Sequence, residues 1–160
     1  DRAKESLFNI LNNHFYFDEV KALDLCAGTG NISYELASRG CPDITAIDDD
    51  NGCVKFIQAT AEKLGMENLH AFRAEIFQYI DKDYKQYDLI FADPPYDFED
   101  YERLVEQIFF KNLLSEEGIL VIEHQSMKDL STFDHFREVR KYGNVSFSFF
   151  EYGEESDEEE

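Results

Sequence analysis

Short apolar runs alternate with segments of helical periodicity along the chain of 160 residues. Five runs have the length and the β-branched and aromatic content of strands, namely residues 20–26, 44–48, 69–73, 87–93 and 118–124. Apolar side chains recur at helical spacing in 3–15, 31–40, 51–66 and 99–112, and 76–80 indicates a short turn or helix. This alternation of strand and helix predicts an α/β fold.

Two of the apolar runs are nearly continuous, at residues 89–92 and 119–122. Such runs indicate strands that are covered on both faces, as in a parallel sheet. A turn is expected at Glu117-Gly118, just before the fifth strand, and residues 136–152 predict a hairpin that turns at Gly143-Asn144. The pattern therefore favours a mostly parallel sheet with antiparallel strands at one edge.

Composition is consistent with one globular domain, which we expect to span residues 1–152. The chain has 35 acidic and 15 basic residues and a net charge of −20, and seven of the acids lie in its last ten residues. Residues 153–160 have the composition of an acidic, disordered tail, to which we assign no function. An acidic surface of this kind repels phosphate groups.

Several classes of protein are disfavoured by what the sequence lacks. No apolar run approaches the length that spans a bilayer, and no signal peptide is visible. The three cysteines contain no C-x-x-C pair, and the four histidines show no ligand spacing, so neither a disulfide framework nor a metal site is expected. These features fit a cytoplasmic protein that does not bind a membrane.

Candidate binding residues follow the predicted strands, where a parallel sheet places its ligands. After the first strand, which contains Asp24, comes Ala27-Gly28-Thr29-Gly30 (the glycine loop), where two glycines allow the backbone to approach a ligand closely. The third glycine of a dinucleotide pattern would fall at Ser33, which weakens the alternative of an NAD oxidoreductase. Asp48 ends the second strand, where a carboxylate can accept both hydroxyls of a ribose.

The third strand is followed by Glu75 and Ile76. The Glu75 carboxylate could accept a hydrogen bond from the amine of an adenine, and the Ile76 N–H could donate to its ring. An acid at this position is also a common cap of the following helix, so both interpretations stay open.

The fourth strand ends in Asp93-Pro94-Pro95-Tyr96 (the proline loop). Prolines fix φ and have no N–H, so the chain leaves the sheet as a stiff loop whose carbonyls are free to accept hydrogen bonds. A carboxylate and a carbonyl that each accept one hydrogen of a nucleobase amine favour its nucleophilic form. Tyr96 can stack on a base that has left its helix. The alternative is a turn that only ends a strand.

These motifs together resemble class I S-adenosylmethionine-dependent methyltransferases with a D/N-P-P-Y sequence. "DRAKESLFNIL", "ALDLCAGTGNISYELASRG", "ITAIDDDNGCVKFI" and "FADPPY" are similar, in order and spacing, to the RsmD family of bacterial 16S ribosomal RNA guanine-N2 methyltransferases. The resemblance implies a Rossmann-like, seven-stranded sheet and S-adenosylmethionine as methyl donor. It also implies methylation of the N2 amine of a guanine in 16S rRNA, within a small-subunit ribosomal particle and by a monomer.

The resemblance also assigns roles to residues. It implies that the proline loop holds the target guanine. The residues that it places at the donor are Phe8, Asp24, Ala27, Gly28, Thr29, Gly30, Asp48, Glu75, Ile76 and Asp93. Two features depart from the family. The family's basic N-terminal segment is not among these 160 residues, and we expect it to precede them. The acidic tail is outside the family's pattern.

Three alternatives remain beside an RNA methyltransferase. A DNA adenine-N6 methyltransferase would have the same motifs. The sequence lacks the third glycine that an NAD oxidoreductase would have, and a catalytically silent nucleotide-binding module would have little use for the proline loop. The choice of guanine over adenine rests on the resemblance alone.

Overall fold

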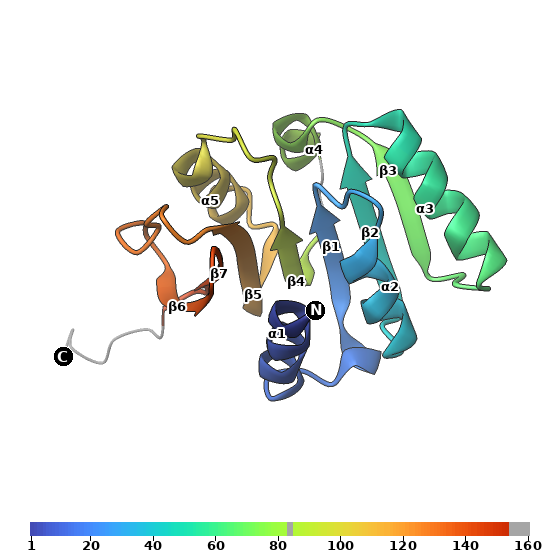
Figure 1. The fold of residues 1–160 in the computed structure, drawn as a ribbon, viewed down its shortest axis with the longest axis horizontal. Helices are drawn as coiled ribbons and strands as arrows, with labels where there is room; N and C mark the ends of the chain where they lie inside the picture. Colours follow the sequence, from blue (N-terminus) through green and yellow to red (C-terminus); the bar gives the residue numbers. More distant parts are fainter. Residues whose placement is uncertain (83–84, 154–160) are drawn as a thin grey trace.

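The computed structural model describes residues 1–82 and 85–153, and it contains a single mixed sheet of seven strands in the order β3-β2-β1-β4-β5-β7-β6 (Figure 1). Strands β1 to β5 run parallel to one another, whereas β7 is antiparallel to β5 and β6. The strands are β1 (Lys21–Leu25), β2 (Asp43–Asp48), β3 (Leu69–Arg73), β4 (Tyr87–Ala92), β5 (Leu114–Gln125), β6 (Phe136–Tyr142) and β7 (Val145–Phe150). The predicted fold class is confirmed.

Helices cover both faces of this sheet (Figure 1). They are α1 (Arg2–Asn12), the short 3-10 helix η1 (Phe17–Glu19), α2 (Asn31–Ser38), α3 (Asn51–Lys63), α4 (Ile76–Lys82) and α5 (Tyr101–Phe110). Helices α1, α2 and α3 pack on one face, and α4 and α5 pack on the other. Strands β1, β2 and β4 are therefore buried on both sides, which explains their continuous apolar sequences, whereas the edge strand β3 has His70 and Phe72 exposed on one side.

The apolar stripe of each helix faces the sheet. In α1, Leu7, Phe8 and Leu11 are almost fully buried, and in α5 the same holds for Leu104 and Ile108. Burial of one large aliphatic or aromatic side chain contributes about 1.5–3 kcal/mol, so these stripes hold the helices against the sheet far more strongly than helix propensity alone.

Strand β5 differs from the prediction. The turn expected at Glu117-Gly118 is wrong, because β5 starts at Leu114 and runs through both residues. Its pairing with β4 changes register between Tyr87 and Leu89, so an irregularity absorbs the extra residues without ending the strand. The hairpin turn predicted at Gly143-Asn144 is confirmed, since β6 and β7 pair on either side of it.

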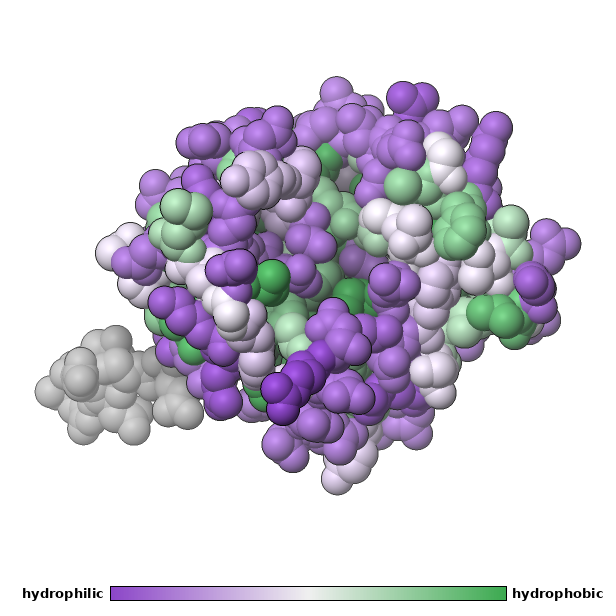
Figure 2. All heavy atoms as spheres, viewed as in Figure 1, coloured by the Kyte–Doolittle hydropathy of each residue, from purple (hydrophilic) through white to green (hydrophobic). Residues whose placement is uncertain are grey.

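Residues 154–160 of the predicted acidic tail lie outside the described residues. Within the described part of the chain, the helices are all too short or too polar to cross a bilayer. Figure 2 shows one face of the molecule, which is largely hydrophilic and has hydrophobic side chains in a hollow near its middle.

Candidate active site

The two sequence loops of interest meet where the sheet reverses its strand order. Strand β1 pairs with β2 on one side and with β4 on the other, so the chain connections leave β1 and β4 in opposite directions. A crevice outside the carboxyl ends of two such strands is the usual ligand site of an open α/β sheet. The glycine loop follows β1 and the proline loop follows β4, so both line this crevice.

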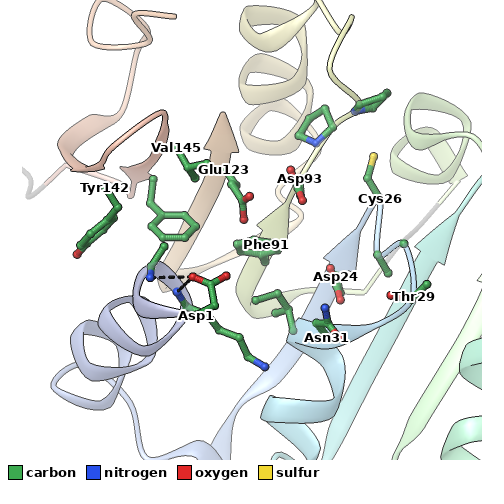
Figure 3. Close-up of a pocket in the computed structure, with 18 of the residues that line it drawn as sticks. Asp1, Asp24, Cys26, Thr29, Asn31, Phe91, Asp93, Glu123, Tyr142 and Val145 are labelled. Atoms are coloured by element: carbon green, nitrogen blue, oxygen red, sulfur yellow. Dashed lines mark hydrogen bonds between the residues drawn. The ribbon is translucent and has the colours of Figure 1, made fainter. Parts of the chain in front are cut away.

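A cavity of about 1200 Å³ occupies the crevice (Figure 3). That volume is large enough for a drug-sized ligand. The carboxyl ends of β1, β2, β4 and β5, the start of α1 and the β6–β7 hairpin all contribute to its walls. Acidic side chains dominate the charged groups, since Asp24, Asp48, Asp49, Asp93 and Glu123 all line the cavity.

The glycine loop is held in a single shape by its neighbours. The N–H of Ala27 donates to the carbonyl of Ile47 at 2.9 Å, and the N–H of Gly28 donates to a carboxylate oxygen of Asp48 at 2.8 Å. Gly28 and Gly30 have φ values of 58° and 93°, which side chains disfavour. A Cβ at Gly28 would meet nothing within 4 Å, so this backbone borders open space in which a ligand can approach it.

Asp48 is both a ligand candidate and a structural part of this loop. Its second oxygen accepts a hydrogen bond from the N–H of Asp50 at 2.9 Å. Each carboxylate oxygen therefore has one backbone donor and keeps a second lone pair, and the side chain lines the cavity. Such a carboxylate is fixed in orientation and can still accept two hydroxyl hydrogens.

Asp24 lies deeper, at the floor of the cavity. It is 1% exposed, and its carboxylate accepts a 2.7 Å hydrogen bond from the hydroxyl of Ser33 in α2. Burial raises the pKa of Asp24 to about 7, while the Ser33 hydroxyl opposes that rise. Ser33, which breaks the dinucleotide glycine pattern, thus orients an acidic side chain that faces the cavity.

The proline loop starts in the sheet and then leaves it. The N–H of Asp93 donates to the carbonyl of Leu25 in β1 at 3.3 Å, and the two prolines then offer no further donor. The N–H of Phe98 donates to the carbonyl of Pro95, which closes a tight turn. Gln125 in β5 donates from its side-chain amide to the carbonyl of Tyr96 at 3.3 Å. These contacts tie the loop to strands on both sides.

Aromatic packing supports the same loop from behind. Phe98 stacks on Phe77 of α4 at a centroid distance of 6.2 Å and meets Tyr101 of α5 edge-on at 5.0 Å. The Arg103 guanidinium lies 3.9 Å from the centroid of Phe77. The Tyr96 ring contacts no other aromatic ring in the described part of the chain and is 84% exposed, so it is available to a ligand at the cavity mouth.

The carboxyl groups of Asp93 and Glu123 share an unusual environment. The Asp93 side chain opens into the solvent-filled cavity, yet protein surrounds most of it, and this desolvation raises its pKa to about 6. Burial, followed by the charges of Asp93 and Asp24, raises the pKa of Glu123 to about 7. Carboxyl groups with raised pKa values gathered in a cleft are typical of a functional site.

Three residues expected at the donor are not among those that line this cavity, and their role at the donor stays a prediction. Phe8 is 1% exposed in the core, where its ring packs near Phe17 and under Arg39. The cavity is lined instead by Asp1, the N-cap of α1, and by Arg2, Ala3, Lys4 and Ser6 at the start of the helix. Glu75 caps α4, since its carboxylate accepts from the N–H groups of Phe77 and Gln78, and neither Glu75 nor Ile76 lines the cavity.

The sequence reasoning also missed residues that the structure brings to the cavity. Glu123 follows the apolar run 119–122 of β5. Phe91 of the apolar run 89–92 and Phe147 of the predicted hairpin have ring centroids 6.4 Å apart and line the cavity as well. Glu123 could have been recognised from the sequence, because it is an acid near the end of the fifth predicted strand.

Solved structures share this fold. The chain superposes on a conserved hypothetical protein of Streptococcus pyogenes with a TM-score of 0.82 and 25% identity, over 92% of this chain and 94% of that one. Coclaurine N-methyltransferase, solved with N-methylheliamine and SAH, gives a TM-score of 0.64 at 22% identity, over 76% of this chain and 35% of that one. The architecture is that of the Rossmann-like methyltransferases.

The family follows from the sequence comparison. Residues 1–151 match the family model described as "Conserved hypothetical protein 95", so the chain belongs to that family, the RsmD family of methyltransferases. "Ribosomal RNA small subunit methyltransferase D" of Buchnera aphidicola subsp. Baizongia pistaciae is 28% identical over 77% of this chain. The protein of the same name from Haemophilus influenzae is 24% identical over 94% of this chain. The resemblance read from the motifs is confirmed.

Coverage of these relatives is incomplete. The chain spans 62% of the length of the Buchnera protein and 80% of the Haemophilus protein. Both names refer to RNA of the small ribosomal subunit, and coclaurine N-methyltransferase was solved with SAH. These proteins support the S-adenosylmethionine cofactor that the motifs imply.

Proposed function

We propose that this protein transfers a methyl group from S-adenosylmethionine to the N2 amine of a guanine in 16S ribosomal RNA. The observation that carries the proposal is the meeting of the glycine loop and the proline loop at one cavity, where the strand order reverses. One loop suits the methyl donor and the other suits a nucleobase amine. Membership of the RsmD family supports the same reaction.

The residues on the donor side fit S-adenosylmethionine. The open backbone at Gly28 leaves room for a ligand, and the oriented Asp48 carboxylate can accept hydrogen bonds from two ribose hydroxyls. Asp24 adds a buried acid, and an acidic cavity favours a cationic ligand. When bound, the donor supplies a methyl group on a positively charged sulfur, which is a good leaving group.

The residues on the acceptor side act on the amine. The lone pair of a guanine N2 amine is delocalised into the ring, which makes the nitrogen a poor nucleophile. The Asp93 carboxylate accepts one amine hydrogen and the Pro94 carbonyl accepts the other, which favours the nucleophilic form as the new N–C bond develops. The nitrogen then loses one proton, for which Asp93 is a nearby acceptor.

Positioning supplies the remainder of the rate enhancement. The contacts of Gln125 and Phe98 hold the proline loop in place, so the amine meets the donor in a defined orientation. Tyr96 stacks on the base at the mouth of the cavity, as enzymes that act on an extruded base require. The rings of Phe91 and Phe147 add apolar surface to the wall of the cavity.

Labelled S-adenosylmethionine tests the proposal directly. The protein is incubated with unmodified small ribosomal subunits, naked 16S RNA and duplex DNA, and the methylated base is identified by mass spectrometry after digestion. We expect N2-methylguanine in ribosomal RNA, with greater yield from the assembled particles. Methyladenine in DNA, or no transfer to any of the three substrates, would overturn the proposal.

A further inference from the structure

Glu123 is an acidic residue that lines the cavity. The proposed reaction assigns it no role. Glu123 is half-buried at the carboxyl end of β5. Among the described residues, its carboxylate makes no hydrogen bond and no ion pair with another side chain or with the backbone. A half-buried acid that faces a cavity without a protein partner is costly to the fold, which points to a partner supplied by a ligand.

The sheet sets Glu123 next to Asp93. Ala92 of β4 pairs with Ile122 of β5 in parallel register, so the following residues on the two strands are neighbours on the same face. Figure 3 shows both carboxylates directed into the space beside Phe91. On its other side, Glu123 pairs with Phe147 of β7. A base amine held at Asp93 therefore has its neighbouring ring edge close to Glu123.

The side chains of Asp93 and Glu123 and the backbone of Pro94 provide acceptors at this end of the cavity. The carboxylates of Asp93 and Glu123 accept hydrogen bonds when ionised, and Pro94 contributes a carbonyl without an N–H. A ligand that satisfies them must present several donors side by side. The pKa of Glu123 is raised to about 7, and a ligand N–H at its carboxylate favours the ionised form. Above that pH an acceptor on the ligand would face an ionised carboxylate and be repelled, so the comparison of ligands belongs at about pH 8.

Among the standard bases, only guanine meets this requirement at an exocyclic amine. The guanine N2 amine is next to the ring N1–H, so its edge offers three donor hydrogens in a row. The adenine N6 amine is next to N1, and the cytosine N4 amine is next to N3, and both ring nitrogens are acceptors. Enzymes read an extruded base through hydrogen bonds to this edge.

We propose that Glu123 accepts the N1–H of the target guanine while the proline loop holds its N2 amine, so that Glu123 selects guanine over bases whose ring nitrogen is an acceptor. This inference rests on the proposed function, because it names the residue that recognises the base at the same site. Glu123 is thus a specificity-determining residue, whereas Asp93 acts on the reacting nitrogen.

The test compares guanosine with 2-aminopurine at the methylated position of a 16S RNA fragment. 2-Aminopurine keeps the amine but its N1 is an acceptor. We expect the wild-type protein to favour guanosine by more than about tenfold in kcat/KM, because a site built around a hydrogen bond rejects an analogue that lacks the donor. Equal rates on the two RNAs in the wild-type protein would overturn the inference without any variant.

Glu123→Gln then assigns the preference to the side chain. An amide offers both an acceptor and a donor, so we expect the rate on guanosine to fall and the ratio between the two RNAs to approach one. Glu117→Gln, at an exposed position near the start of the same strand, is the matched control and should keep the wild-type ratio. SAH affinity, measured by calorimetry, should be unchanged in both variants. The melting temperature should be unchanged in Glu117→Gln and no lower than the wild-type value in Glu123→Gln, because the amide removes a half-buried charge.

The two proposals fail in different ways. If the wild-type protein transfers no methyl group to guanosine in RNA, the proposed function is wrong and this inference falls with it. If guanosine is methylated and Glu123→Gln keeps the wild-type preference over 2-aminopurine, the proposed function stands and the role of Glu123 is wrong.

Discussion

The Asp48 carboxylate accepts a 2.8 Å hydrogen bond from the backbone N–H of Gly28, and this bond joins the ends of β1 and β2 at the proposed donor site. The same side chain is proposed to bind the ribose. Asp48 thus combines two tasks, since it shapes the loop that faces the donor and contacts the donor itself.

Replacement of Asp48 should weaken donor binding. In Asp48→Ala, two charge-assisted hydrogen bonds to the ribose are lost, so we expect the binding free energy of SAH to fall by roughly 1.5–3 kcal/mol. Calorimetry on the folded variant measures the change. Asp18→Ala, an exposed acid ahead of β1, serves as control and should bind normally. Unchanged affinity in Asp48→Ala would remove Asp48 from the site.

The two glycines of the glycine loop should respond differently to alanine. At Gly28 an added Cβ has open space, so Gly28→Ala should fold with a loss of about 1–2 kcal/mol from its positive φ, and it should bind SAH more weakly because the Cβ enters the cavity. At Gly30 the Cβ would lie 2.7 Å from the Tyr34 ring, so Gly30→Ala should lose more stability than Gly28→Ala. Chemical denaturation and calorimetry separate the effects, and equal stability losses would contradict this assignment.

Replacement of Asp93 should slow methyl transfer and have little effect on donor binding. Asp93→Ala removes the acceptor of an amine hydrogen, so methyl transfer should nearly stop while SAH affinity stays close to normal. Asp93→Asn keeps an acceptor oxygen and should be milder. Single-turnover rates with labelled donor give the comparison, and the hydrogen-bonding role would be wrong if the two variants lost activity equally.

Tyr96 should contribute to RNA binding through its ring. Its 84% exposure means that Tyr96→Ala removes little buried surface, so the melting temperature should stay within about a degree of the wild-type value. Loss of a base-stacking platform should cost about 1–3 kcal/mol, seen as a raised KM for RNA. Tyr96→Phe keeps the ring and should behave as wild type. A normal KM in Tyr96→Ala would show that the base does not stack there.

The stability of the protein should fall as pH rises from about 4 to about 7. Burial raises the pKa of Asp24 to about 7 in the folded state, so the folded protein binds a proton that the unfolded chain has released, and the stabilisation is lost as pH rises through that value. Asp24→Asn keeps an acceptor for the Ser33 hydroxyl but cannot titrate. The wild-type slope should exceed the variant slope by up to about 1.4 kcal/mol per pH unit, and identical slopes in urea titrations would contradict the raised pKa.

Much of the site could be predicted from the sequence because a parallel sheet gathers its strand ends. Once the apolar runs are assigned to parallel strands, their carboxyl ends must share one edge, so the glycine loop, Asp48 and Asp93 were expected together. Local chemistry added the rest, since two glycines permit a close backbone approach and two prolines stiffen the loop that follows Asp93.

The tertiary structure decided which of the other polar residues join them. Glu123 reaches Asp93 only because β5 pairs with β4 in the observed register, and strand pairing depends on contacts between segments distant in sequence. Ser33 acquires a role only when α2 packs against β1 and brings its hydroxyl to Asp24. Phe8 turns into the core because the apolar stripe of α1 faces the sheet, and the start of that helix meets the cavity instead. Periodicity identifies the side of an element that is buried, whereas the packing of distant elements determines which side chains share a cavity.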